Sequence, residues 1–179
     1  MSRSKRAAGG LALATALVLA PATHADKTTV SDPKDDVADG LEYLDIRKAV
    51  ATHAEGGKLR HVVRVEKVEK ENENTTRAIQ IIIKVGSKRF VIYGSGPGKA
   101  PVMNQSSGNQ TGNAKLHRSG KRVIFDFDPK VIGNPAAYKW YVEASPNPGI
   151  YTGKYDRAPN KGTRRHEIGS AAGATVTRR

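Results

Sequence analysis

The sequence predicts an all-β domain, an antiparallel β-sandwich or barrel. Two observations predict this fold class. Apolar and polar residues alternate with a period of two over at least five segments, and Gly, Pro and Asn turn signals separate these segments at short intervals. Helix signals are nearly missing, because the one candidate is a short turn within 129–138 and Pro135 limits its length. Of the two architectures we expect the sandwich, as a single domain.

The predicted strands begin after an acidic, turn-rich opening. The first alternates apolar side chains on one face and ends at Gly56 and Gly57, a turn signal. The most apolar segment, 77–85, contains a continuous isoleucine run, which favours a central strand buried on both faces. The predicted strands are 44–52, 58–68, 77–85, 88–93, 114–118, 122–127 and 138–144.

Two segments fall outside this pattern. Residues 94–113 are twenty residues rich in Gly, Pro, Ser, Asn and Gln, and a structureless loop of that length is usually functional or disordered. Residues 162–179 show no apolar periodicity, which predicts a disordered basic tail.

The first 25 residues have the order of a secretory signal peptide. Three basic residues precede the uncharged apolar run 9–20, and a small-residue cleavage site ends at Ala25. The apolar run has 12 residues, fewer than the roughly 20 of a membrane-spanning helix. We therefore predict a secreted protein with a signal peptide over 1–25, a β-sandwich domain over 26–161 and a basic tail over 162–179.

The charge of the chain is strongly positive and uneven. The formal net charge is +13, of which +3 belongs to the signal peptide, leaving +10 for the mature chain. Between Asp32 and Asp45 the sequence has six acids and one lysine, whereas from Lys154 onward it has seven Lys or Arg and two acids. Such a surface favours anionic partners, and we expect anionic envelope polymers or polysaccharides rather than a specific nucleic acid or a membrane span. The alternative is a charge that serves solubility alone.

No catalytic motif is recognisable. The chain contains no cysteine, which excludes thiol catalysis and zinc-thiolate sites. The glycine-rich segment 94–100 departs from a phosphate-binding loop, because Tyr93 and Ala100 stand where that motif requires Gly and Ser or Thr. His61 lies in a predicted strand, which favours a packed side chain. We therefore expect a non-catalytic binding or cell-envelope interaction module without a cofactor.

Two carboxylates keep a hydrolase open as an alternative. Asp126 and Asp128 flank Phe127 and lie on the same side of one predicted strand. Residues two apart along a strand are about 6–7 Å apart, within the roughly 5–10 Å that glycosidase carboxylate pairs require. The same alternation is typical of an ordinary amphipathic strand. A structural protein without a small-molecule ligand is the other alternative.

The acidic opening suggests a calcium site. Calcium takes six to eight oxygen ligands from carboxylates and carbonyls in turn-rich segments. The candidate ligands are Asp32, Asp36 and Asp45, with Asp39 as a further candidate, although their spacing is not that of an EF-hand. The alternative is a solvated loop in which the Asp side chains cap turns.

A late group of aromatic residues offers a second kind of binding surface. Exposed rings among Tyr138, Trp140, Tyr141, Tyr151 and Tyr155 would stack on sugar rings. Strand alternation instead predicts that Trp140 belongs to the core.

Three short stretches carry a resemblance to a known group of proteins. They are Asp32-Pro33-Lys34-Asp35-Asp36 leading into Leu44-Asp45-Ile46, the strand 59–65, and Ile132-Gly133-Asn134-Pro135 before Trp140 with Asp156-Arg157-Ala158-Pro159-Asn160-Lys161-Gly162. With these stretches the chain resembles a family of small, uncharacterised secreted proteins of high-GC Gram-positive bacteria, similar to carbohydrate-binding-type modules. The resemblance implies a jelly-roll-like sandwich and implies no reaction.

Overall fold

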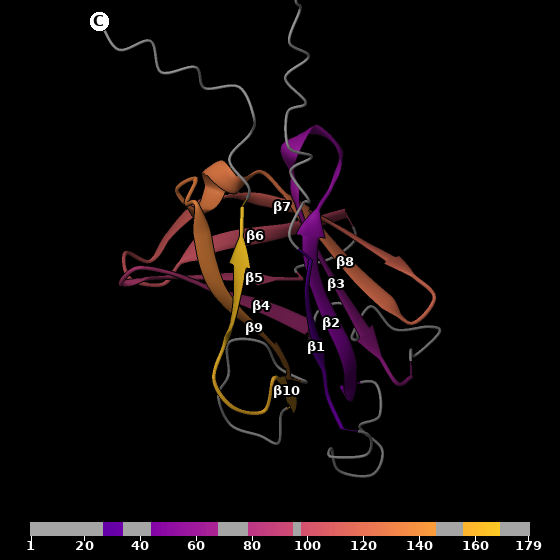
Figure 1. Ribbon diagram of the computed structural model, residues 1–179. Helices are drawn as coiled ribbons and strands as arrows, with labels where there is room; N and C mark the ends of the chain where they lie inside the picture. The colour runs from indigo at the N-terminus through magenta and orange to yellow at the C-terminus, as the bar shows by residue number, and fades with distance from the viewer. Residues whose placement is uncertain (1–26, 34–43, 68–78, 95–97, 146–155, 169–179) are drawn as a thin grey trace, which may run out of the picture.

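A computed structural model describes residues 27–33, 44–67, 79–94, 98–145 and 156–168 of the chain. These residues form strands and two short 3-10 helices (Figure 1). The strands are β1 (Thr28–Ser31), β2 (Ile46–His53), β3 (Leu59–Val65), β4 (Ile79–Val85), β5 (Lys88–Tyr93), β6 (Gly98–Asn104), β7 (Asn109–Ser119), β8 (Arg122–Phe127), β9 (Ala137–Ala144), β10 (Asp156–Ala158) and β11 (Arg164–Glu167); the 3-10 helices are η1 (Glu55–Gly57) and η2 (Pro129–Ile132).

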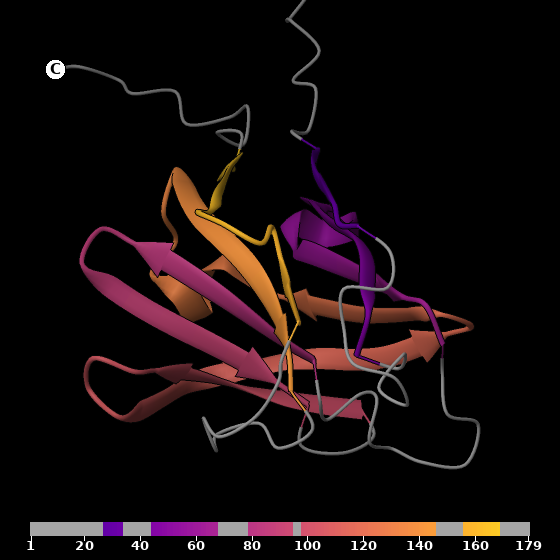
Figure 2. The same cartoon turned by 90° about the horizontal axis from the view of Figure 1, so that it is seen from below.

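All of these strands belong to one antiparallel sheet. The order is β1-β2-β3-β8-β7-β6-β5-β4-β9-β10, and β11 also pairs with β9. The sheet curls until its edges approach each other, so it is nearly closed into a barrel (Figures 1 and 2). Irregularities in the register between Ile46 and Lys48 and between Val102 and Met103 add to this curvature, since β-bulges increase twist. The all-β antiparallel class is therefore confirmed, whereas the two separate sheets of a sandwich are not shown.

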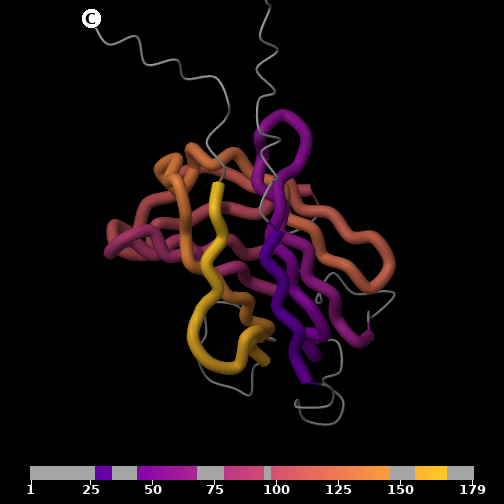
Figure 3. The backbone as a smooth tube through the Cα atoms, in the orientation of Figure 1, coloured from indigo at the N-terminus to yellow at the C-terminus, as the bar shows by residue number. Residues whose placement is uncertain are grey.

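The sheet edges meet along a seam that side chains close. We define the seam as the junction between β1 and β2 on one side and β10 and β11 on the other. Asp156 Oδ2 accepts the backbone N–H of Ile46 at 2.5 Å, and Thr28 Oγ1 donates to the carbonyl of Arg165 at 3.1 Å. Within the described residues no backbone ladder joins these edges. Figure 3 shows β1 and β11 running next to each other.

The core fills the inside of the curled sheet. Alternate residues of every long strand point inward, and Trp140, Phe125 and Ile81 are fully buried there. The isoleucine-rich strand β4 is also covered on its outer face, where Ile82 packs with Val91 and Tyr141. The predicted burial of this strand on both faces and the predicted core position of Trp140 are confirmed.

The segment 94–113 corrects the expectation of a structureless loop. Its described part forms β6 and the first half of β7, which pair with each other around the turn 105–108. Ala100 and Val102 point into the core, so the strand buries enough apolar surface despite its polar composition. Gly112 leaves room for η2, because a Cβ there would lie 2.5 Å from Val131 Cγ1.

The end of the domain also lies later than the sequence predicts. Residues 164–167 form β11, pair with β9 and bury His166, so a disordered tail does not begin at residue 162. The strand is four residues long and has only one inward apolar or aromatic side chain, which is too short a pattern to detect. The remainder of the predicted tail, 169–179, lies outside the described residues, as do the predicted signal peptide, Asp36 and Asp39.

The described ranges contain no helix that is long and apolar enough to cross a membrane.

Candidate anion-binding surface

The register of the sheet aligns four cations on its outer face. Lys84 of β4 lies directly opposite Arg89 of β5 on one side and Lys139 of β9 on the other. Lys139 in turn lies opposite Arg165 of β11. We call these four residues the β4 row. The row places one positive charge on each of four adjacent strands, and neighbouring strands are about 4.8 Å apart.

The four side chains differ in exposure and in partners. Lys84 and Lys139 are exposed, and no ion pair holds either one within the described residues. Arg165 donates to Glu167 Oε1 at 2.6 Å, which raises the pKa of Arg165, but both side chains are more than half exposed. An exposed ion pair of this kind contributes little stability and leaves the arginine accessible. Arg89 is half-buried and extends the row onto β5.

Such a row is unfavourable for folding. Like charges directly opposite each other on neighbouring strands destabilise a sheet, by roughly 0.2–1 kcal/mol per pair. The β4 row contains three such pairs. A bound anion would remove this repulsion, because it supplies negative charge to every member at once.

An apolar strip, the outer-face cluster of β4, β5 and β9 around Ile82, lies beside the row on the same face. Lys84 Nζ is 5.7 Å from the ring centre of Tyr141, and the guanidinium of Arg157 lies 4.2 Å above the same ring. Glu143 is half-buried next to this strip, and burial raises its pKa while Arg89 and Arg157 act in the opposite sense. The buried Tyr141 ring therefore lies next to one cation of the row, Lys84, and next to Arg157, which lies outside the row.

A second set of aligned cations lies on β2, β3 and β8. Arg64 of β3 is directly opposite Lys48 of β2 and Arg122 of β8. We call these three residues the β3 row. All three are exposed, and Ser31 and Ser119 lie opposite the outer members and so extend the row on both sides.

The carboxylates of the hydrolase alternative both have structural partners. Asp126 accepts two hydrogen bonds from the guanidinium of Arg60, at 2.6 and 2.8 Å, and this contact raises the pKa of Arg60. Asp128 lies beyond the end of β8, where its side chain accepts the backbone N–H of Lys130 at 2.9 Å and caps η2. Asp126 therefore takes part in a cross-strand ion pair, and Asp128 caps a 3-10 helix.

The three aspartates of the calcium hypothesis are only partly described. Asp32 and Asp45 are buried at the same end of β1 and β2, where the Asp32 N–H donates to the Arg47 carbonyl at 3.3 Å. Asp36 lies outside the described residues. The part of the chain that the structure describes holds no group of three His, Cys, Asp or Glu side chains suited to a metal ion. The calcium site stays a prediction.

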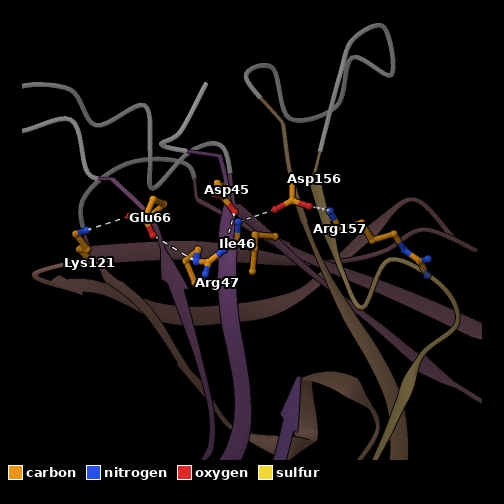
Figure 4. Close-up of polar contacts among 7 residues, drawn as sticks. All are labelled: Asp45, Ile46, Arg47, Glu66, Lys121, Asp156 and Arg157. Atoms are coloured by element: carbon orange, nitrogen blue, oxygen red, sulfur yellow. Dashed lines mark hydrogen bonds and ion pairs between the residues drawn. The ribbon is translucent and has the colours of Figure 1, made fainter. Parts of the chain in front are cut away.

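Polar contacts at this end of the barrel lie at the seam and on the wall beside it (Figure 4). Asp156 spans the seam with its two oxygens, since Oδ2 accepts from Ile46 N and Oδ1 accepts from Arg157 N at 2.6 Å. Just beyond the end of β3, Glu66 lies between Arg47 of β2, at 3.3 Å, and Lys121 of the β7–β8 turn, at 3.9 Å. These acids are therefore engaged close to the barrel end and are not available to neutralise the cation rows.

The aromatic candidates for sugar stacking are packed where they are described. Tyr138 and Trp140 lie inside the barrel, and Tyr141 is covered on the outer face. Tyr138 Oη is 2.8 Å from His61 Nε2, and complete burial lowers the pKa of His61 to about 3. His61 is a packed core residue, as predicted. Tyr151 and Tyr155 lie outside the described residues.

Comparisons of the chain with protein-family models, with curated proteins and with solved structures find no match. The fold and surface by themselves define a class, that of a basic all-β domain whose sheet register aligns exposed cations in rows. Strand alternation in the sequence puts Lys84 and Lys139 on outward faces, but it does not give the register that makes them neighbours.

Proposed function

We propose that this protein is an exported, non-catalytic module that binds anionic polysaccharide through the β4 row. The observation that supports the proposal is the alignment of Arg89, Lys84, Lys139 and Arg165 on four adjacent strands. The signal-peptide pattern of residues 1–25 supports export, which puts the basic surface in contact with polymers outside the cytoplasm.

A linear polymer suits the row better than a small anion. The charges are distributed in a line across the strands, at intervals of roughly 4.8 Å, instead of converging on one point. A chain that carries carboxylate, phosphate or sulfate groups along its length can follow this line and meet several cations together. Each contact is weak in water, so the affinity comes from their number and is sensitive to salt.

The side chains around the row favour a polysaccharide over a single-stranded nucleic acid. Proteins that bind single-stranded nucleic acid combine cations with aromatic rings on which the bases stack. Among the described residues the rings of Phe, Tyr and Trp are buried, apart from the half-buried Tyr93. The row therefore offers charge without a stacking platform.

Binding to polygalacturonate, with neutral dextran as the uncharged control, tests the proposal. We expect the double variant Lys84→Gln/Lys139→Gln to bind more weakly and to lower the slope of log K against log salt by roughly one unit per lysine. The matched control is Lys58→Gln/Lys130→Gln, which removes two exposed charges outside both rows and should bind nearly like the wild type.

Three outcomes contradict the proposal. Equal losses in the two double variants would mean that net charge, and not the row, determines binding. Equal binding to dextran and polygalacturonate would contradict recognition of charge. Tighter binding to a single-stranded DNA oligonucleotide than to polygalacturonate at the same salt concentration would assign the surface to nucleic acid.

A further inference from the structure

The two cation rows lie on different parts of the barrel wall. The β4 row runs across β5, β4, β9 and β11, whereas the β3 row runs across β8, β3 and β2. Along the sheet, β6 and β7 separate them on one side, and the seam separates them on the other. They share no strand and no residue.

The rows also lie near opposite ends of the molecule. The β4–β5 turn, residues 86–87, directly follows the end of β4 beside the β4 row, and the β7–β8 turn, residues 120–121, directly precedes Arg122 of the β3 row. Figures 1 and 2 place these two turns on opposite sides of the molecule in both views. One straight polymer segment on the outer face therefore cannot lie along both rows.

The β3 row keeps its charge because neighbouring acids have other partners. Glu66 contacts Arg47 and Lys121, and Asp126 is held by Arg60. Within the described residues no ion pair reaches Lys48, Arg64 or Arg122, and Arg122 contacts only the hydroxyl of Ser119, at 3.5 Å. Like the β4 row, the β3 row aligns like charges on adjacent strands, and it does so on an independent surface.

We infer that one molecule binds two anionic polysaccharide chains, one on each row, and so cross-links them. The inference rests on the proposed function and adds a second site with the same ligand chemistry. Two sites facing away from each other bind separate chains at little mutual cost, because a Debye length of about 8 Å at physiological salt screens one row from the other. A dense polymer would then hold the protein with an avidity that neither row alone provides.

A two-step capture assay tests the inference. Polygalacturonate is immobilised, the monomeric full chain without its signal peptide is captured at low salt, and a short fluorescent polygalacturonate oligosaccharide is added after washing. The wild type and the control Lys58→Gln/Lys130→Gln should retain the oligosaccharide. Lys84→Gln/Lys139→Gln and Arg64→Gln/Arg122→Gln should each still be captured, through the intact row, and should lose most of the retained fluorescence.

The outcomes separate the two proposals. Absence of capture of the wild type would contradict the proposed function and this inference together. Capture without retention of the oligosaccharide would overturn cross-linking and leave the proposed function intact. Undiminished retention by either row variant would also overturn it, because bridging would then not need two rows. Thermal unfolding of the variants checks their fold, and their midpoints should be no lower than the wild type, since each substitution removes like-charge repulsion.

Discussion

The wall of the barrel and its seam are built from different chemistry. The wall consists of the consecutive strands β3-β8-β7-β6-β5-β4-β9. Backbone ladders join these strands, and the interior behind them is apolar. Around the seam, side chains form the contacts and the interior contains polar groups. These are Thr28, Asp156 and His166 of the seam strands, together with His61 and Tyr138, which reach the same interior from the bounding wall strands β3 and β9.

The difference shows how a sheet can approach closure without a final ladder. Thr28 Oγ1 contacts both the Arg165 carbonyl and His166 Nδ1, each at 3.1 Å, and Asp156 replaces a missing backbone acceptor for Ile46. Because Asp156 and His166 are buried, leaving a group without its partner there costs more than it would on the surface. The stability of the seam should therefore depend on a few side chains, whereas that of the wall is distributed over many backbone bonds.

The largest expected effect is acid sensitivity from His61. Its pKa is about 3 in the folded protein against 6.5 as the ordinary value, so between these pH values the unfolded chain takes up a proton that the folded chain does not. This group therefore lowers the free energy of unfolding by about 1.4 kcal/mol per pH unit as the pH falls from 6.5, or about 4 kcal/mol near pH 3.5.

Urea unfolding across this pH range measures the effect. In His61→Gln the free energy of unfolding should fall less steeply as the pH is lowered, by about 1.4 kcal/mol per pH unit. In the wild type the imidazole signals of His61 should stay those of the neutral ring at pH 4.5 in an NMR titration. A ring that protonates near pH 6.5 would show that the interior behind the seam is wet, and the contrast with the wall would disappear.

The second prediction compares two aspartates that each accept two hydrogen bonds. Asp156→Ala removes the buried acceptor of Ile46 N and Arg157 N at the seam and should cost about 3 kcal/mol. Asp126→Ala removes the partner of Arg60 on the outer wall, where the Arg60 side chain is 41% exposed, and should cost about 1 kcal/mol or less. Equal losses in chemical denaturation would refute the idea that the seam depends on individual side chains.

The smallest effect is expected from Thr28→Val, which keeps the shape of the side chain and removes its hydroxyl. The variant should lose about 1 kcal/mol because the contacts to Arg165 and His166 are partly exposed. Thr29→Val changes the exposed neighbour on the same strand and serves as the control, with a change near zero. A thermal midpoint unchanged in both variants would mean that the Thr28 hydroxyl contributes nothing to closure.

Sequence patterns were sufficient for the fold class because alternation is a local property. Strands with several inward apolar residues, such as β4 and β8, were predicted within two residues of their ends. β1, β10 and β11 have three or four residues, too few to show a period, and β6 is masked by its Gly and Pro content. Whether strands form two sheets or one curled sheet depends on pairing between distant segments, which alternation does not determine.

For the same reason, the candidate site could not be predicted from the sequence. The net positive charge predicts an anionic partner, but Lys84, Lys139 and Arg165 are far apart in the chain and become neighbours only through the registers of β4, β9 and β11. Asp126 and Asp128 show the same limit. Their spacing leaves a hydrolase open as an alternative, and nothing in the sequence indicates Arg60, which holds Asp126 from 66 positions away.

The contact between Thr28 and Arg165 has a consequence for how the domain is joined to other polypeptide. The first and last described strands lie side by side, so the chain enters and leaves the barrel at neighbouring points. A short linker from Ile168 back to Lys27 would connect them, and new ends could be opened at a hairpin turn without crossing the core. The same closeness makes the domain insertable into a loop of another protein, since the host would have to bridge only a narrow gap.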